Sequence, residues 1–82
     1  MATALLDSSI CLEQAVREVE RLGVKARALW VVRLEPDGST RVCPGVGIGE
    51  DHYWTADSAM HDLEQAVEWA AVVATLARGV RA

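Results

Sequence analysis

Residues 25–43 read KARALWVVRLEPDGSTRVC, a pattern that first alternates and then turns back on itself. Over its first ten positions the side chains alternate with period two, which is typical of a β-strand. One side of that strand is wholly apolar and consists of Ala26, Ala28, Trp30, Val32 and Leu34. Residues 36–39 then combine a proline of preset φ, an acceptor side chain and a glycine free to adopt positive φ. We therefore predict an antiparallel hairpin in which residues 40–43 form the second strand.

The chain beyond this hairpin is less regular. Pro44 has no amide N–H, so we expect it to end the second strand or to confine that strand to a sheet edge. Residues 45–49 alternate glycine with Val46 and Ile48, which fits either a bulged continuation of the strand or a flexible loop. Residues 52–54 read HYW and are compatible with a short third strand.

An amphipathic helix is predicted before the hairpin. Its apolar positions recur at helical spacing and are Leu12, Ala15, Val16, Val19 and Leu22. Asp7, Ser8 and Ser9 offer capping oxygens at its start, and Gly23 can adopt the left-handed conformation that ends a helix. We expect the helix to run from about residue 9 to residue 23, with Cys11 as a small core residue.

A second amphipathic helix is predicted after the sheet. Thr55, Asp57 or Ser58 is expected to cap its start, and we expect it to end near Gly79. Its predicted inner stripe consists of Met60, Leu63, Ala66, Val67, Ala70, Ala74 and Ala77. The pentapeptide LEQAV occurs in both helices, at residues 12–16 and 63–67. Because its residues are good helix formers at amphipathic spacing, we attribute the recurrence to convergence rather than duplication.

Together these elements predict one α+β domain over residues 1–82. The expected order is α-β-β-(β)-α, with a single antiparallel sheet of two to three strands and both helices packed on one face of it. Residues 1–7 are expected to be frayed or disordered. A chain this short buries only about 60 per cent of the surface that its unfolded form exposes, so we expect marginal stability to which a partner contributes.

Negative charge is concentrated in the C-terminal half. Residues 42–77 contain six carboxylates and no lysine or arginine, within a chain of net charge −4. Spacing of 100° per residue predicts one stripe along the second helix made of Asp57, His61, Glu64 and Glu68. An ordinary solvated face is the plain interpretation, but such faces usually interleave both signs, as Glu13 and Arg17 do. We therefore predict that a basic partner is bound by an acidic set: Glu50, Asp51, Asp57, Glu64 and Glu68.

The later half of the second helix is apolar on a further side. Four residues are expected to lie away from Leu63 and Val67, namely Trp69, Val72, Val73 and Leu76. A helix that is apolar on both sides needs cover on both sides, which so small a sheet and one other helix do not readily provide. We predict that these four residues form a dimer contact or a docking patch, anchored by Trp69. Packing within the domain is the alternative.

No pattern in the chain predicts catalysis. The one grouping of metal-type side chains matches no metal motif in its spacing, and we interpret it as surface residues: Asp51, His52, Asp57, His61 and Asp62. The glycines of residues 45–49 lead to Glu50 and Asp51, which would repel a phosphate. Cys11 and Cys43 form no metal-type or redox-type pair and are expected to remain free thiols. We expect no enzyme activity, no metal and no cofactor.

The order helix, three strands, helix resembles that of double-stranded RNA-binding domains. The resemblance covers topology alone. Those domains place basic residues at the start of the second helix, where this chain reads TADSAMHD over residues 55–62. Because binding to a phosphate backbone needs positive charge, we expect no nucleic-acid partner.

These features predict a protein that works by binding another protein. The first residues do not resemble a signal peptide and no apolar run is long enough to cross a bilayer, so we expect a cytoplasmic location and no membrane partner. The favoured hypothesis is an acidic inhibitor or adaptor of a basic, nucleic-acid-handling protein, of the kind found in phage and mobile elements. The alternatives are a structural subunit or homodimer that acts in assembly and, third, an enzyme dependent on a metal or small molecule.

Overall fold

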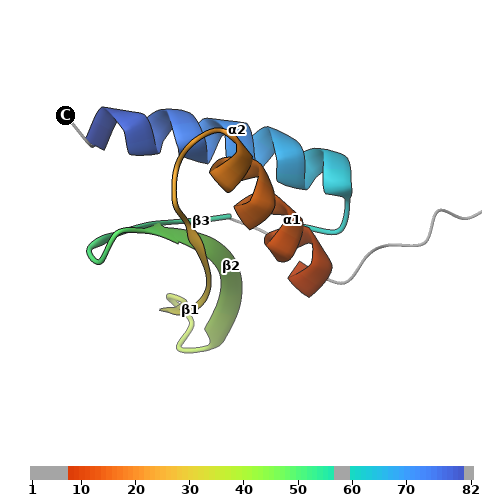
Figure 1. Ribbon diagram of the computed structural model, residues 1–82. Helices are drawn as coiled ribbons and strands as arrows, with labels where there is room; N and C mark the ends of the chain where they lie inside the picture. Colours follow the sequence, from red (N-terminus) through yellow and green to blue (C-terminus); the bar gives the residue numbers. More distant parts are fainter. Residues whose placement is uncertain (1–7, 57–59, 81–82) are drawn as a thin grey trace, which may run out of the picture.

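The chain folds as an α+β protein, and the computed structural model describes residues 8–56 and 60–80 of it. Its elements are α1 (Ser8–Arg21), β1 (Arg27–Leu34), β2 (Thr40–Ile48), β3 (His52–Thr55) and α2 (Leu63–Val80) (Figure 1). The strands form one antiparallel sheet in the order β1-β2-β3. The predicted fold class and the third strand are therefore confirmed. The expected fraying of residues 1–7 and the suggested caps Asp7, Asp57 and Ser58 lie outside the described residues.

Helix α1 matches the predicted amphipathic helix closely. Its buried side is made of Cys11, Leu12, Ala15 and Val19, so Cys11 is a core residue as expected. Gly23 follows the helix with a φ of 93°, the left-handed conformation that commonly ends helices. The guanidinium of Arg78 in α2 donates a hydrogen bond to the Leu22 carbonyl. This bond ties the end of α1 to the last turns of α2.

The turn between β1 and β2 has the predicted chemistry. The Glu35 N–H donates to the Ser39 carbonyl at 2.8 Å, and Gly38 adopts a φ of 88°. The Asp37 carboxylate accepts hydrogen bonds from the hydroxyl and the N–H of Ser39, at 2.6 and 2.9 Å. These two bonds, the hydroxyl first, lower the pKa of Asp37 because they stabilise its charged form.

Strand β2 continues through Pro44, contrary to the prediction that this residue ends the strand or lies at an edge. β2 is the central strand, and Pro44 lies opposite Trp30 of β1. Its carbonyl accepts a hydrogen bond from the Ala56 N–H at 2.9 Å, on the side of β3. Because the N–H and C=O of a strand residue point to the same side, the missing N–H would also face β3. The proline is thus accommodated where β3 ends, without loss of a β1–β2 bond.

Gly45 and Gly47 belong to this regular strand and not to a flexible loop or a bulge, whereas Gly49 lies in the turn after it with a φ of 65°. The β1–β2 register is uninterrupted from Arg27 opposite Gly47 to Leu34 opposite Thr40. A Cβ atom at Gly45 would lie 2.9 Å from the Trp54 carbonyl oxygen, and one at Gly47 would lie 3.0 Å from a methyl carbon of Leu29. Glycine is therefore required at position 45, where the close neighbour is backbone, whereas a larger residue at position 47 would need the side chains of Leu29 and Arg27 to move.

Helix α2 begins later than predicted, at Leu63. The Asp62 carboxylate accepts a hydrogen bond from the Glu64 N–H at 2.7 Å, so Asp62 acts as the cap while Thr55 belongs to β3. The predicted inner stripe is correct for four buried residues of the helix: Ala66, Ala70, Ala74 and Ala77. Met60 is buried as well, but it lies before the helix begins. The stripe is wrong for Leu63 and Val67, which are exposed by 41 and 40 per cent. Val73 is buried in their stead.

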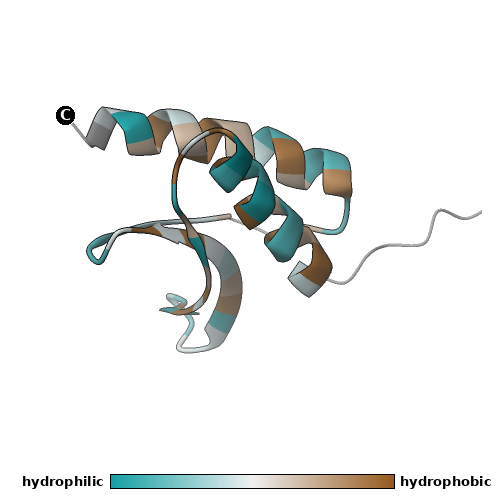
Figure 2. Ribbon diagram, viewed as in Figure 1, coloured by the Kyte–Doolittle hydropathy of each residue, from teal (hydrophilic) through white to brown (hydrophobic). Residues whose placement is uncertain are grey.

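The two helices cover the face of the sheet that carries Val46 (Figure 1). Much of their contribution to the core is alanine, with Leu12, Val19 and Val46 among the larger buried side chains. Trp54 and Trp69 are half-buried against this core, whereas Trp30 and Tyr53 are exposed. Hydrophobic residues also recur along the hairpin below the helices and along α2 (Figure 2). The core of the described residues is therefore built of small side chains while many large apolar ones remain outside it.

Candidate protein-binding surfaces

An uncovered apolar surface lies on the β1–β2 hairpin. It consists of Trp30, Val32, Leu34 and Val42, which we call the hairpin patch. Val32 and Leu34 are exposed by 65 and 77 per cent, and Val42 lies opposite Val32 in the register. Glu35, which forms an ion pair with Arg41, and Asp37, which accepts hydrogen bonds within the turn, follow β1. Apolar exposure of this extent within one small element is typical of an interaction surface.

The hairpin patch shares its face of the sheet with the core. Side chains directly opposite each other in an antiparallel pair point to the same face, and every second residue of a strand does so as well. Val46 lies opposite Ala28 and Trp54, and by alternation Trp30 and Val32 point the same way. The turn of the hairpin lies at the end of the sheet away from α2 (Figure 1). The helices therefore cover Val46 and leave the hairpin patch open.

A second surface is the side of α2 that points away from the core. We call this side the α2 outer face. It consists of Glu64 and Glu68 in the first half of the helix and Val72 and Leu76 in the second half, which follow one another at intervals of four residues. Val72 and Leu76 are exposed by 56 and 47 per cent. Together with Ala71 and Thr75 they border a shallow hollow of about 290 Å³. Carboxylates and apolar side chains thus meet on one helix face.

The structure corrects part of the predicted apolar patch on α2. Val73 is buried in the core, and Trp69 is half-buried against the same core, so both face inward. The buried side of the helix is rotated relative to the predicted stripe, because alanines and Val73 rather than Leu63 and Val67 point into the core. Val72 and Leu76 lie on the surface where they were expected. Trp69 lies partly against the core and not wholly on the outer side of the helix.

The acidic residues are divided between the two ends of α2. Glu64 and Glu68 are exposed on its first half, but α2 begins at Leu63, so the predicted helical stripe does not extend back through His61. Asp57 lies outside the described residues. Glu64 and Glu68 therefore remain as the helical part of the predicted acidic set.

Glu50 and Asp51 occupy a different place, the turn between β2 and β3. Gly49 and His52 beside them border the same cleft as Ala77, near the C-terminal end of α2. With a rise of about 1.5 Å per residue, that end lies roughly 20 Å along the helix from Glu64. Arg27 donates a hydrogen bond to the Gly49 carbonyl at this turn. The four described members of the acidic set, Glu50, Asp51, Glu64 and Glu68, are thus not brought together into one site.

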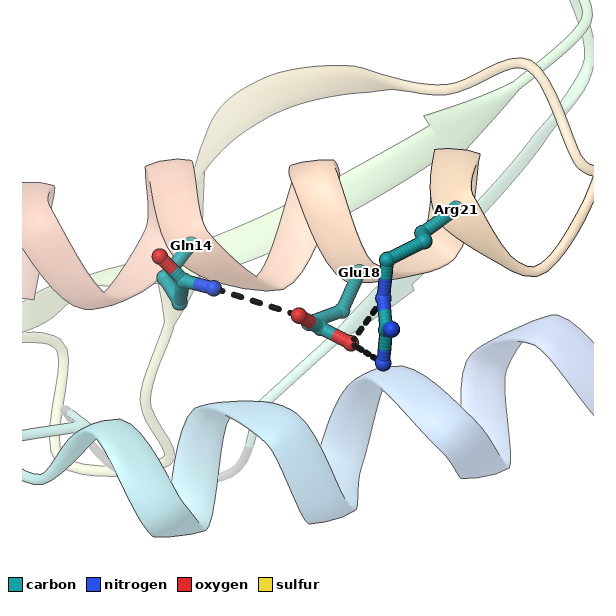
Figure 3. A network of polar contacts seen from close by, with 3 residues as sticks. All are labelled: Gln14, Glu18 and Arg21. Atoms are coloured by element: carbon teal, nitrogen blue, oxygen red, sulfur yellow. Dashed lines mark hydrogen bonds and ion pairs between the residues drawn. The ribbon is translucent and has the colours of Figure 1, made fainter.

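The charges of α1 offer a contrast to those of α2. Glu18 accepts a hydrogen bond from Gln14 at 3.3 Å and two from the Arg21 guanidinium at 2.9 and 3.1 Å (Figure 3). Arg41 likewise forms an ion pair of 3.2 Å with Glu35. Both ion pairs join residues that lie before residue 42. Glu18 is therefore paired on its own helix, whereas Glu64 and Glu68 form no ion pair with a cation among the described residues.

A cleft of about 710 Å³ was not predicted. The linker between α1 and β1, the end of β2 and the C-terminal part of α2 border it. Lys25, Arg27 and His52 stand around it, and the rings of His52 and Trp54 stack with centroids 6.4 Å apart. Cationic groups beside an aromatic wall can hold a small anion. No sequence signal indicated the cleft, because its residues come from three separate segments.

Other kinds of site receive no support from the described residues. No group of three or more histidine, cysteine or acidic side chains in residues 8–56 and 60–80 is arranged to hold a metal ion. Within the same residues, both cysteines are buried and neither forms a disulfide. Neither α1 nor α2 combines the length and the apolar character required to cross a bilayer.

Comparisons with models of protein families, with curated proteins and with solved structures find no match to this chain. Functional inference therefore depends on the surfaces described above.

Proposed function

We propose that this protein is a non-catalytic protein-binding module whose α2 outer face docks a partner with a basic surface. The main support is that Val72 and Leu76 continue, on the same uncovered helix face, the line of carboxylates formed by Glu64 and Glu68. Such a face offers apolar contact area beside charge. It suits a partner in which an apolar groove is flanked by lysine or arginine side chains.

Electrostatics gives each half of this face a separate role. Exposed carboxylates such as Glu64 and Glu68 steer a positively charged partner and raise the association rate, an effect that salt screens. Apolar contact by Val72 and Leu76 would slow dissociation, because affinity within one interface is set mainly by the off-rate. In its concrete form the proposal is an inhibitor or adaptor that covers a basic, nucleic-acid-facing surface, such as accessory proteins of phage and mobile elements provide.

Charge reversal on α2 tests the proposal. The double variant Glu64→Lys/Glu68→Lys is compared with Glu13→Lys/Glu20→Lys, which makes the same change of charge at exposed positions of α1. Each is used to capture proteins from a lysate of the source cells, and the recovered protein is quantified by mass spectrometry. We expect the α2 variant to lose a basic partner by about tenfold or more and the α1 variant to retain it within about twofold.

Two results would contradict the proposal. One is equal recovery by both variants, since the α2 outer face would then be dispensable. The other is a partner that is acidic or whose capture is the same at about 0.1 M and about 0.5 M salt, because an electrostatically steered contact weakens with ionic strength. Circular dichroism of each variant confirms that the helices remain folded.

A homodimer that acts in assembly is the second candidate. The hairpin patch favours it, because its exposed apolar side chains adjoin an edge strand of the sheet. This candidate uses β1 and leaves α2 free, so the two roles are compatible.

A further inference from the structure

The geometry of β1 points to a specific self-association. We infer that two copies of the chain pair antiparallel along β1, with Val31 opposite Val31 of the second copy, to form a continuous six-stranded sheet. The inference goes beyond the proposed role of α2 and does not depend on it. It rests on the direction of the backbone polar groups of β1, on its side-chain alternation and on its charges.

The outward-pointing backbone groups of β1 can be identified from two hydrogen bonds. The Glu35 N–H donates to Ser39, so Glu35 and the residues two and four before it direct their N–H and C=O toward β2. The Pro44 carbonyl bonds to Ala56 on the side of β3, so Trp30 opposite it is not hydrogen-bonded to β2. Both observations agree on which alternate residues of β1 direct their backbone groups toward β2. The N–H and C=O groups that point outward from this edge strand belong to Ala28, Trp30, Val32 and Leu34.

These groups restrict how a second β1 can pair. A two-fold axis that passes between two residues would oppose outward-pointing groups of one copy to inward-pointing groups of the other. The axis must therefore pass through a residue. Pairing then joins Ala28, Trp30, Val32 and Leu34 with the same set in the second copy, so the apolar sides coincide. The two hairpin patches become one surface on a single face of the joined sheet.

Charge selects among the remaining registers. With the axis at Val31, Arg27 of each copy lies opposite Glu35 of the other, which is the favourable cross-strand pair of opposite sign. With the axis at Trp30, Arg27 would instead lie opposite Arg33, and two like charges would repel in each half. Glu35 already pairs with Arg41 at 3.2 Å, so the incoming arginine would extend an existing ion pair.

Moving the two-fold axis from Val31 to Val32 also removes the pairing of opposite charges. With the axis at Val32, Glu35 would lie opposite Leu29 and Arg33 opposite Val31, so neither charge has a charged partner across the strands. The register centred on Val31 additionally places Trp30 opposite Val32, an aromatic pair with a β-branched residue of the kind that stabilises sheets. The same register therefore satisfies the backbone, the apolar side chains and the charges.

Complementary charge variants test both the contact and its register. Arg27→Glu alone would oppose two acids in each half of the interface, and Glu35→Arg alone would oppose two arginines. A mixture of the two variants restores opposite charges at both ends. We expect the wild type to sediment as a dimer of 8.9 kDa chains, each single variant to dissociate at least about tenfold more readily, and the mixture to form heterodimers.

Analytical ultracentrifugation provides the measurement, with each variant labelled by a different dye for the mixture. A wild type that stays monomeric up to about 0.1 mM overturns the inference. A mixture of the two folded variants that shows no heterodimer also overturns the inference, because it would exclude this register. A dimer that survives Arg27→Glu but is lost in Val72→Asp/Leu76→Asp would place self-association on α2 and also overturns it. Failure of the α2 charge-reversal test would leave these results unaffected.

Discussion

The two ends of one sheet face carry the same kind of side chain and have opposite surroundings. Val46 is fully buried beneath the helices, whereas Val32, which points to the same face from the neighbouring strand, is 65 per cent exposed. The difference comes from the reach of the helices and not from the residues themselves. Apolar alternation therefore identifies which side of a strand prefers to leave water, but what covers that side is decided elsewhere in the molecule.

The largest expected difference in stability is between two variants that place an aspartate at opposite ends of this face. Val46→Asp buries a carboxylate without a partner and should lower the free energy of unfolding by more than about 3 kcal/mol, a large part of the roughly 4 to 12 kcal/mol available to a domain of this size. Val32→Asp should change the stability of the monomer by less than about 1 kcal/mol. Urea denaturation at low protein concentration measures both. Equal losses would mean that the hairpin patch is covered within the monomer.

The repeated pentapeptide offers a second comparison at intermediate magnitude. Leu12 in the first copy is buried, and Leu63 in the second copy is 41 per cent exposed. Leu12→Ala should cost about 2 to 5 kcal/mol, because it removes buried methyl groups and leaves a cavity. Leu63→Ala should cost about 1 kcal/mol or less, since it removes less buried area and alanine has the higher helix propensity. A similar loss in both variants, measured by urea denaturation, would contradict the assigned faces of α2.

The smallest expected effect concerns pH at the uncovered end of the hairpin. The hydrogen bonds from Ser39 hold the pKa of Asp37 below its ordinary value of 3.8. A carboxyl group whose folded pKa is lowered contributes stability above its unfolded pKa and loses it as the pH falls through the folded pKa. The wild type should therefore lose slightly more stability than Asp37→Asn between neutral pH and acid below about pH 4. Urea midpoints of both proteins across this range provide the measurement, and identical pH profiles would show that the turn contributes nothing.

Several features of the fold could be predicted because they depend on near neighbours. The PDGS turn carries its own preset φ, acceptor and glycine, and the periodicity of α1 is visible within four turns. Pro44 was misjudged because its effect depends on which side of β2 its missing N–H faces, and that side is defined by where β3 ends. The start of α2 was misplaced because several residues before it can serve as caps, and spacing alone does not show that Asp62 is the one whose carboxylate accepts the Glu64 N–H.

The candidate surfaces could likewise be predicted only in part. Val72, Leu76, Glu64 and Glu68 could be placed on the outside of α2 from spacing, whereas Trp69 and Val73 could not be assigned correctly. A helix with apolar residues around most of its circumference has no single preferred inward direction in sequence. The small alanines of α2 decide that direction, because they allow close packing against α1.

The amino-acid sequence by itself determined the kinds of element, their order, the hairpin turn and the excess of negative charge in the C-terminal half. These properties arise from interactions over a few residues or from composition, and both can be read along the chain. Tertiary structure alone decided that β2 passes through Pro44, that the acidic residues separate to the two ends of α2, and that the apolar side of β1 stays in contact with water. Each of these depends on which distant segment lies beside a residue, and burial is a property of such neighbours rather than of the residue itself.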